Sequence, residues 1–160
     1  MSIQSILTGL VDGGIDFVVV GGVAGAVHGS PFVTNDVDIC YRVDRTNIAR
    51  LAKILSRWGA YPRGWEDDLP FVMDARTIKT TPLLTLRTAE GDVDLLDRVS
   101  GVGDYESVFE SSEEITVFGI RFRVLTLDAL IRSRRAAARP KDLAQLPTLE
   151  ALVELKSRDR

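Results

Sequence analysis

The pattern of apolar positions along the chain predicts an alternation of helices and strands. Residues 2–11 place apolar side chains at helical spacing, and a pair of glycines then ends this predicted helix. The next apolar run, Phe17–Val20, is continuous and mostly β-branched, which favours a strand covered on both faces. Gly21 and Gly22 follow directly, so the backbone can turn sharply there and approach a ligand closely. A short helical segment after them would present free amide groups to a phosphate.

The middle of the chain continues this pattern. Asp44 caps a predicted helix with one apolar face, which ends at Gly59 and would cover the sheet as a crossover. A hairpin is predicted through residues 89–91, and a weaker one within residues 115–124. The chain is therefore expected to mix helices with a sheet, without repeats or an interdomain linker.

The last part of the chain is predicted to be helical and is rich in basic residues. The helical region starts at Thr126, is interrupted at Pro140 and resumes to about Lys156. Its basic residues are Arg132, Arg134, Arg135, Arg139 and Lys141. This spacing suits a solvated helix surface, and it equally suits contact with a triphosphate or with RNA phosphates.

Two Asp-x-Asp pairs stand out among the polar positions: Asp36 with Asp38, and Asp92 with Asp94. In a strand, residues two apart point to the same face, so each pair would present two hard oxygen ligands together, as Mg²⁺ or Mn²⁺ prefers. With 15 aspartates in 160 residues, chance alone gives roughly one or two such pairs. The apolar residues around both pairs make a chance origin less convincing, because an unpartnered carboxylate is costly in an apolar environment. Surface carboxylates without a metal are the alternative.

Composition limits the choice of protein class. A chain of 160 residues with 45% hydrophobic content fits one domain over residues 1–160. Its formal charge of −3 offers no general attraction for nucleic acid. The lone Cys40 is expected in the core, in a reducing compartment. Since no apolar run is long enough to span a bilayer, we expect no membrane partner and a cytoplasmic location.

These motifs together resemble a known family. The segments GGVAGAVHGSPFVTNDVDI, TLRTAEGDVDLLDRV and LDALIRSRRAAARPKDLAQL are similar to the nucleotidyltransferase superfamily, whose fold is shared with DNA polymerase β. They most resemble the small bacterial members grouped with abortive-infection and MenT-type toxins. The resemblance implies an α/β (α+β) nucleotidyltransferase fold, in which a mixed twisted β-sheet is flanked by helices. Residues 1–160 would form a single nucleotidyltransferase domain ending in C-terminal helices.

The resemblance also implies roles for particular residues. Asp36 and Asp38 would hold a metal ion, Mg²⁺ or Mn²⁺, that bridges the phosphates of a nucleoside triphosphate (NTP). Asp94 would join them at a second metal ion and help to deprotonate the attacking hydroxyl, as in two-metal phosphoryl transfer. The nucleotide-binding residues would be Gly21, Gly22, Thr34 and Lys141. From the residues alone, Thr34 either donates to a phosphate or simply precedes the strand.

The other titratable residues near these motifs receive less direct roles. Asp94 lies deeper in its predicted strand than Asp92, which we interpret as a turn residue beside Gly91. Asp97 would fall on the opposite face and be exposed to solvent. His28, the sole histidine, fits a packing or capping role better than that of a catalytic base.

Two kinds of function follow from these features. The first is a magnesium-dependent, ATP- or other NTP-using enzyme that transfers a nucleoside monophosphate to an acceptor. The acceptor would be RNA or tRNA, a protein or a small molecule, and the enzyme would be a candidate toxin with an antitoxin protein as partner. The second is a catalytically weak member of the fold that binds a nucleotide or a partner. It is favoured because residues 31–35 hold no basic residue, where the relatives commonly have one.

Overall fold

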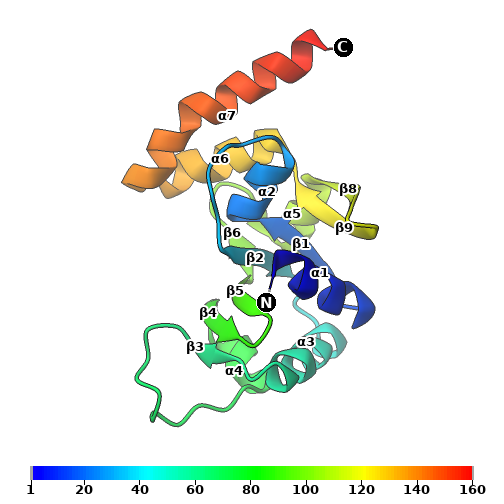
Figure 1. The fold of residues 1–160 in the computed structure, drawn as a ribbon, viewed down its shortest axis with the longest axis vertical. Helices are drawn as coiled ribbons and strands as arrows, with labels where there is room; N and C mark the ends of the chain where they lie inside the picture. Colours follow the sequence, from blue (N-terminus) through cyan, green and yellow to red (C-terminus); the bar gives the residue numbers. More distant parts are fainter. Residues whose placement is uncertain (1, 160) are drawn as a thin grey trace.

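The computed structural model describes residues 2–159, and its centre is a mixed β-sheet (Figure 1). The strands of this sheet are β1 (Phe17–Val20), β2 (Asp36–Tyr41), β3 (Tyr61–Pro62), β4 (Leu83–Thr88), β5 (Gly91–Leu96), β8 (Ser112–Val117) and β9 (Ile120–Leu125). Their order is β3-β4-β5-β2-β1-β9-β8. The pairs β1–β9 and β2–β5 are parallel, and the other neighbouring strands are antiparallel. A separate short ribbon consists of β6 (Arg98–Val99) and β7 (Gly103–Asp104).

Helices lie on both faces of this sheet. They are α1 (Ile3–Asp12), α2 (Gly21–Val27), α3 (Arg45–Arg57), α4 (Ala75–Thr80), α5 (Tyr105–Glu110), α6 (Leu127–Ala137) and α7 (Pro140–Arg158). On one face of β2, the Tyr41 hydroxyl reaches the backbone of α4, which contacts α3. On the other face, α2 contacts β2, and its Gly21 lies against the side chain of Asp38. The expected fold class, a mixed sheet flanked by helices, is therefore confirmed.

The strand patterns explain how the core forms. All residues of β1 are buried, as its continuous apolar run predicts, while β2 alternates and buries Val37 and Ile39 completely. Cys40 is also buried, as expected. One apolar cluster extends from Ile6 in α1 to Leu149 in α7. The first and the last helix therefore pack on the same core.

The predicted C-terminal helices form a helical hairpin. The side chain of Thr126 caps α6, and Ala138, in the left-handed conformation with φ of 53°, separates it from α7. Pro140 is the first residue of α7, where its missing N–H is not needed. In Figure 1, α7 lies beside α6, which contacts α2 next to the sheet. None of the helices described between residues 2 and 159 combines the length and apolar character needed to cross a membrane.

Both predicted hairpins are confirmed. β4 and β5 join through Ala89 and Glu90, and β8 and β9 join through Phe118 and Gly119. The second hairpin is longer than expected, because Ile120 already belongs to β9. Phe118 and Gly119 both have positive φ, which fits the two-residue turns that suit the twist of a hairpin.

Two of the aspartate predictions are wrong. Asp92 lies within β5, directly opposite Asp36 of β2, and is not a turn residue. Asp97 is half-buried, and its Oδ1 atom is fully buried without a hydrogen-bond partner among the described residues, so it is not solvent-exposed. The reason is that β5 ends at Leu96 and the chain turns at once into β6, against which α5 packs.

Candidate active site

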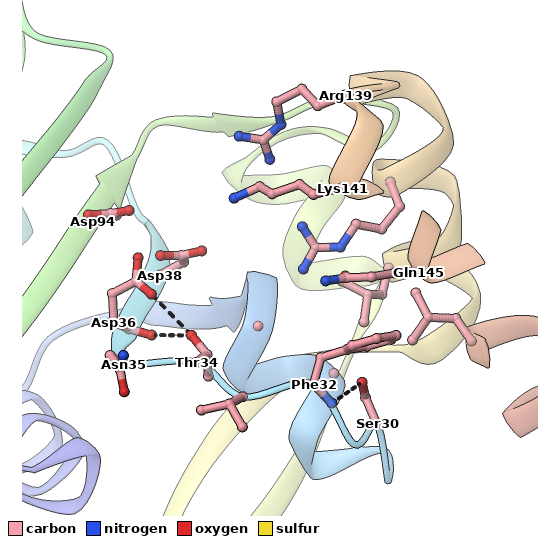
Figure 2. A pocket seen from close by; sticks show the side chains of 16 residues that line it. Ser30, Phe32, Thr34, Asn35, Asp36, Asp38, Asp94, Arg139, Lys141 and Gln145 are labelled. Atoms are coloured by element: carbon pink, nitrogen blue, oxygen red, sulfur yellow. Dashed lines mark hydrogen bonds between the residues drawn. The ribbon is translucent and has the colours of Figure 1, made fainter. Parts of the chain in front are cut away.

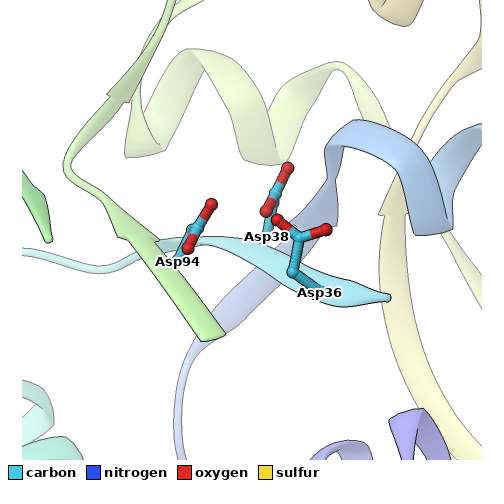
Figure 3. A group of neighbouring side chains, drawn as sticks. All are labelled: Asp36, Asp38 and Asp94. Carbon is cyan, nitrogen blue, oxygen red and sulfur yellow. The ribbon is translucent and has the colours of Figure 1, made fainter. Parts of the chain in front are cut away.

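Three carboxylates meet at the centre of the sheet. β2 and β5 run parallel with Asp38 beside Asp94, so the side chains of both residues and of Asp36 share one face. One oxygen from each of these carboxylates lies within 4.8 Å of the others (Figure 3). The structure therefore brings together the residues predicted from the sequence as metal ligands, and we call Asp36, Asp38 and Asp94 the aspartate triad.

The double glycine creates the space for this triad. Gly21 begins α2 with φ of +63°, and a Cβ atom added there would collide with the carboxylate of Asp38. A Cβ atom on Gly22 would lie 2.8 Å from the side chain of Thr34. Side chains larger than hydrogen would thus displace two of the predicted site residues.

Thr34 holds Asp36 in position. Its hydroxyl donates to the Oδ1 atom of Asp36 at 3.0 Å and lies 3.2 Å from the backbone carbonyl of the same residue (Figure 2). The sequence offered two interpretations of Thr34, a contact with a phosphate or a position just before the strand, and Thr34 does lie just before β2. The structure adds a contact that neither interpretation included, since the hydroxyl orients a carboxylate.

The environment of Asp38 favours a cation. Burial, with the nearby charges of Asp94 and Asp36, raises the pKa of Asp38 to about 8. The Oδ1 atom of Asp38 is buried and has no hydrogen-bond partner among residues 2–159. Burial also raises the pKa of Asp94, although Arg63 opposes this change. An unpartnered oxygen within a cluster of hard oxygen donors fits the preference of Mg²⁺ or Mn²⁺.

Arg63 is a site residue that the sequence analysis missed. It follows β3, its Nη1 atom donates to the carbonyl of Leu86 at 2.9 Å, and its Nη2 atom donates to Oδ1 of Asp94 at 2.5 Å. The same Nη2 atom is 3.8 Å from Asp36. The available signal was that Arg63 is the one cation in the acidic stretch from residue 60 to 75.

On the other side, the triad opens into a cavity of about 380 Å³. Arg134 of α6 lines it, together with Arg139 and Lys141 at the start of α7. In Figure 2, Arg139 and Lys141 face the carboxylates across the space. Gly22 and Thr34 also line it. We call this space the basic cavity.

A buried carboxylate organises the basic cavity. Asp142 has no exposed surface, and its oxygens accept from Nη1 of Arg134 at 3.2 Å and from Nε of Arg139 at 2.7 Å. Although burial acts to raise its pKa, the hydrogen bonds and charge of Arg139 hold the pKa of Asp142 below its usual range. By contrast, Lys141 makes no ion pair within the part of the chain that the structure describes. Its ammonium group is therefore available to a ligand.

His28 takes the packing and capping role expected of it. It is buried at the end of α2, where its Nε2 atom lies 2.8 Å from the carbonyl oxygen of Leu125. Its Nδ1 atom lies 2.9 Å from the ammonium of Lys156. The carbonyl can only accept and the ammonium can only donate, so Nε2 carries the proton and Nδ1 accepts.

The fold and the site together define a nucleotidyltransferase-like protein. A family model described as "Nucleotidyl transferase of unknown function (DUF2204)" matches residues 1–158, and the chain belongs to this family. No curated protein matches the chain.

Solved structures with this fold are distant in sequence. A candidate nucleotidyltransferase from Thermotoga maritima is 16% identical, with 98% of this chain and 91% of that chain covered and a TM-score of 0.53. An antigenic nucleotidyltransferase-like protein from Paracoccidioides brasiliensis is 20% identical, with 96% and 74% covered and a TM-score of 0.54. These likenesses show the nucleotidyltransferase fold.

Proposed function

We propose that this chain is a metal-dependent nucleotidyltransferase that moves a nucleoside monophosphate from an NTP to an acceptor hydroxyl or phosphate. The observation that carries the proposal is the aspartate triad facing the cations of the basic cavity across a space open to a ligand. Membership of the family supports it. In this proposal residues 1–160 act as one nucleotidyltransferase domain.

The triad would hold Mg²⁺ or Mn²⁺. Its donor set consists of hard oxygens, and the Oδ1 atom of Asp38 is buried without a hydrogen-bond partner among residues 2–159. When bound, such ions neutralise phosphate charge and lower the pKa of a coordinated hydroxyl. Asp36, Asp38 and Asp94 are the ligands in this proposal.

The cations of the basic cavity would bind the triphosphate. Arg134 and Arg139 are fixed by Asp142, so guanidinium groups are oriented before the nucleotide arrives. Lys141 adds a further charge from the start of α7. Gly21 and Gly22 keep the backbone of α2 close enough to contact the phosphates.

The transfer itself is a displacement at the α-phosphate. A lone pair of the acceptor oxygen forms the new bond to phosphorus, and the bond from phosphorus to the α,β-bridging oxygen breaks. Pyrophosphate leaves with that electron pair, and the hydroxyl proton passes to the carboxylate of Asp94. Arg63 donates to the Oδ1 atom of Asp94 and so fixes the orientation of this carboxylate.

The alternative is a catalytically weak member that binds a nucleotide or a partner protein. It is favoured by the absence of a basic residue from positions 31–35 and by Arg63, which already neutralises part of the triad. Within the enzyme proposal, RNA or tRNA, proteins and small molecules are the acceptor classes. A role as a MenT-like or abortive-infection toxin with an antitoxin partner belongs to the same proposal.

Thermal unfolding with nucleotides tests this function. Wild-type protein with each NTP and Mg²⁺ or Mn²⁺ should gain about 2.7 kcal/mol at a ligand concentration of 100 times the dissociation constant. The double variant Asp36→Asn/Asp38→Asn should lose this gain. Asp92→Asn is the matched control, because Asp92 shares the face of the triad but lies outside the group.

The outcome separates the two candidates. A metal-dependent gain in wild type, followed by transfer of label from an α-labelled NTP, supports the enzyme. Binding without transfer to any acceptor class supports the weak member. If no NTP and metal pair stabilises wild type, the aspartate triad is not a nucleotide site.

A further inference from the structure

The basic cavity changes from charged to apolar along its length, and α2 gives the direction of this change. At the charged end, a Cβ atom on Gly22 would lie 2.8 Å from Thr34, whose hydroxyl donates to the triad. Three residues further along α2, a Cβ atom on Gly25 would lie 3.5 Å from Ser30 and 3.7 Å from Leu130. Both glycines line the cavity, so α2 runs along it from the triad toward the side chain of Leu130.

The hairpin of α6 and α7 shows the same change. On α6, Leu130 and Arg134 are four residues apart, so they lie on one helix face. On α7, Lys141, Gln145 and Leu149 follow one another at the same spacing. All five residues line the cavity. Because the chain reverses between the two helices, the cations lie close to the reversal and the leucines lie far from it.

The length of this gradient exceeds that of a phosphate group. Eight residues of α-helix, from Lys141 to Leu149, rise about 12 Å. The cavity volume of about 380 Å³ falls in the range of small-molecule sites. Leu130 and Leu149 are each only 1% exposed, so the apolar end lies deep in the fold. A ligand that fills the whole cavity therefore has an anionic part at one end and an apolar part at the other, as a nucleotide does.

Phe32 offers a flat surface between the two ends. It lies on the loop between Ser30 and Thr34, which contact α2 at opposite ends of the cavity. The side chain of Phe32 lines the cavity, and 37% of its surface is exposed. Its backbone N–H donates to the Oγ atom of Ser30 at 3.3 Å (Figure 2), which helps to fix the loop. An aromatic ring can stack on any nucleobase, because every base has a π-face.

Gln145 supplies a polar group in the middle of the cavity-facing side of α7. Its amide carries both hydrogen-bond donors and an acceptor. Among the residues drawn in Figure 2, this amide makes no hydrogen bond. The edge of a nucleobase also carries donors and acceptors, so the amide is suited to bind one directly.

We propose that the apolar end of the basic cavity is the nucleobase site, in which the base stacks on Phe32 and forms a hydrogen bond with the amide of Gln145. The triphosphate lies at the charged end, with the cations and the triad. This inference rests on the proposed function. It adds that the chain binds a nucleotide in preference to an inorganic triphosphate.

Calorimetric titration measures what the base contributes to binding. The probes are the α,β-methylene analogues of the four NTPs, which prevent turnover, and inorganic tripolyphosphate, each with Mg²⁺. In wild type, the tightest nucleotide should bind at least about tenfold more tightly than tripolyphosphate. Phe32→Ala should weaken binding of that nucleotide about tenfold and change tripolyphosphate binding by about twofold or less. Phe32→Tyr keeps an aromatic ring and should retain nucleotide binding.

The matched control for the ring is Phe118→Ala. Phe118 is 64% exposed in the turn between β8 and β9 and does not line the cavity. This variant should bind both kinds of probe as wild type does. Thermal unfolding checks that the Phe32 and Phe118 variants remain folded, which their exposed positions favour.

The amide is tested in the same way. Gln145→Leu keeps the approximate size of the side chain and should weaken nucleotide binding about fivefold, with tripolyphosphate binding unchanged. Gln4→Leu is its control, because Gln4 is exposed on α1 and lies outside the cavity. The proposal is overturned if either Phe32→Ala or Gln145→Leu leaves nucleotide binding unchanged, or if it weakens nucleotide and tripolyphosphate equally.

The same titrations separate this proposal from the proposed function. Asp38→Asn should weaken the binding of both kinds of probe with Mg²⁺, because both carry the phosphates. If wild type binds nucleotides and tripolyphosphate equally tightly and Asp38→Asn binds neither, the phosphate and metal part of the proposed function is supported and the nucleobase site alone is refuted. If wild type binds neither kind of probe, both proposals are refuted.

Discussion

The two sides of the aspartate triad differ in how many cations face it. On one side, α6 and α7 supply Arg134, Arg139 and Lys141 to the basic cavity. On the other, Arg63 alone reaches the triad, from a loop whose remaining charged residues up to Asp74 are carboxylates. A net charge of −3 conceals this division. The difference teaches that cations can be concentrated on one side of an acidic triad in a chain whose net charge is negative.

The two sides also differ in how their side chains are held. The arginines of the basic cavity are anchored by Asp142, which has no exposed surface. The loop that carries Arg63 is held by the packing of the Tyr61, Trp65 and Phe71 rings and by the hydroxyl of Tyr61. Rigid guanidinium groups suit the constant shape of a triphosphate.

The largest expected effect comes from removing the anchor of the basic cavity. Asp142→Asn leaves Arg134 and Arg139 without their buried counter-charge, so the free energy of unfolding should fall by about 3–5 kcal/mol. Urea denaturation measures it. Glu150→Gln, which breaks the exposed pair with Arg135, should change stability by about 1 kcal/mol or less. Similar losses in the two variants would show that Asp142 does not organise this side.

The next effect tests the space that α2 leaves for the triad. Gly21→Ala combines a left-handed backbone with a collision at Asp38, and we expect a loss of about 2–4 kcal/mol. Gly59→Ala is the matched control, because it has φ of +65° with nothing within 4 Å of an added Cβ. It should lose about 1–2 kcal/mol. Thermal unfolding with and without Mg²⁺ measures both variants, and equal losses would contradict the role of Gly21.

The sequence predicted those parts of the site that depend on local pattern. Residues two apart in a strand share a face, so Asp36 and Asp38 were predicted correctly to point together. The sequence also identified Gly21 and Thr34 as close to the site, because both adjoin the strand that carries the pair. The roles of these residues in binding remain predictions.

What the sequence missed depends on contacts between distant segments. Arg63 and Asp94 are 31 positions apart, and only the return of the chain through β3 brings them together. The prediction that Asp97 is exposed to solvent was wrong because it extended the alternation of the strand past Leu96, where β5 ends. The burial of Asp142 could not be predicted from the sequence either. A charged residue near a helix start is usually exposed. Asp142 is buried here because it pairs with Arg134 and Arg139.

The third prediction concerns pH in the absence of metal. The pKa of Asp38 is about 8 in the folded protein, against an ordinary value of 3.8 for an aspartate in the unfolded chain, so the folded state binds more protons between these values. Stability should therefore fall as pH rises from about 4 to 8. Asp38→Asn stays neutral and should gain roughly 1–2 kcal/mol relative to wild type at pH 8, with little gain below pH 4.

Denaturation in EDTA across this range measures the dependence on pH. Asp92→Asn serves as the control, because Asp92 lies outside the triad. A constant difference between Asp38→Asn and wild type at all pH values would contradict the raised pKa. Added Mg²⁺ should remove the decline in wild type alone, since the ion then supplies the missing charge.

The smallest effect compares a lysine inside the basic cavity with one outside it. Lys141 lines the basic cavity, and Lys79 lies on α4 and does not line it. Lys141→Met should weaken binding of ATP with Mg²⁺ about tenfold, or ~1.4 kcal/mol, while Lys79→Met should change it by about twofold or less. Calorimetry on both variants measures this difference. AMP should be less sensitive than ATP to Lys141→Met, because it lacks the β- and γ-phosphates that the basic cavity would hold. Equal losses for the two lysines would mean that the nucleotide responds only to total charge and that the basic cavity does not hold its phosphates.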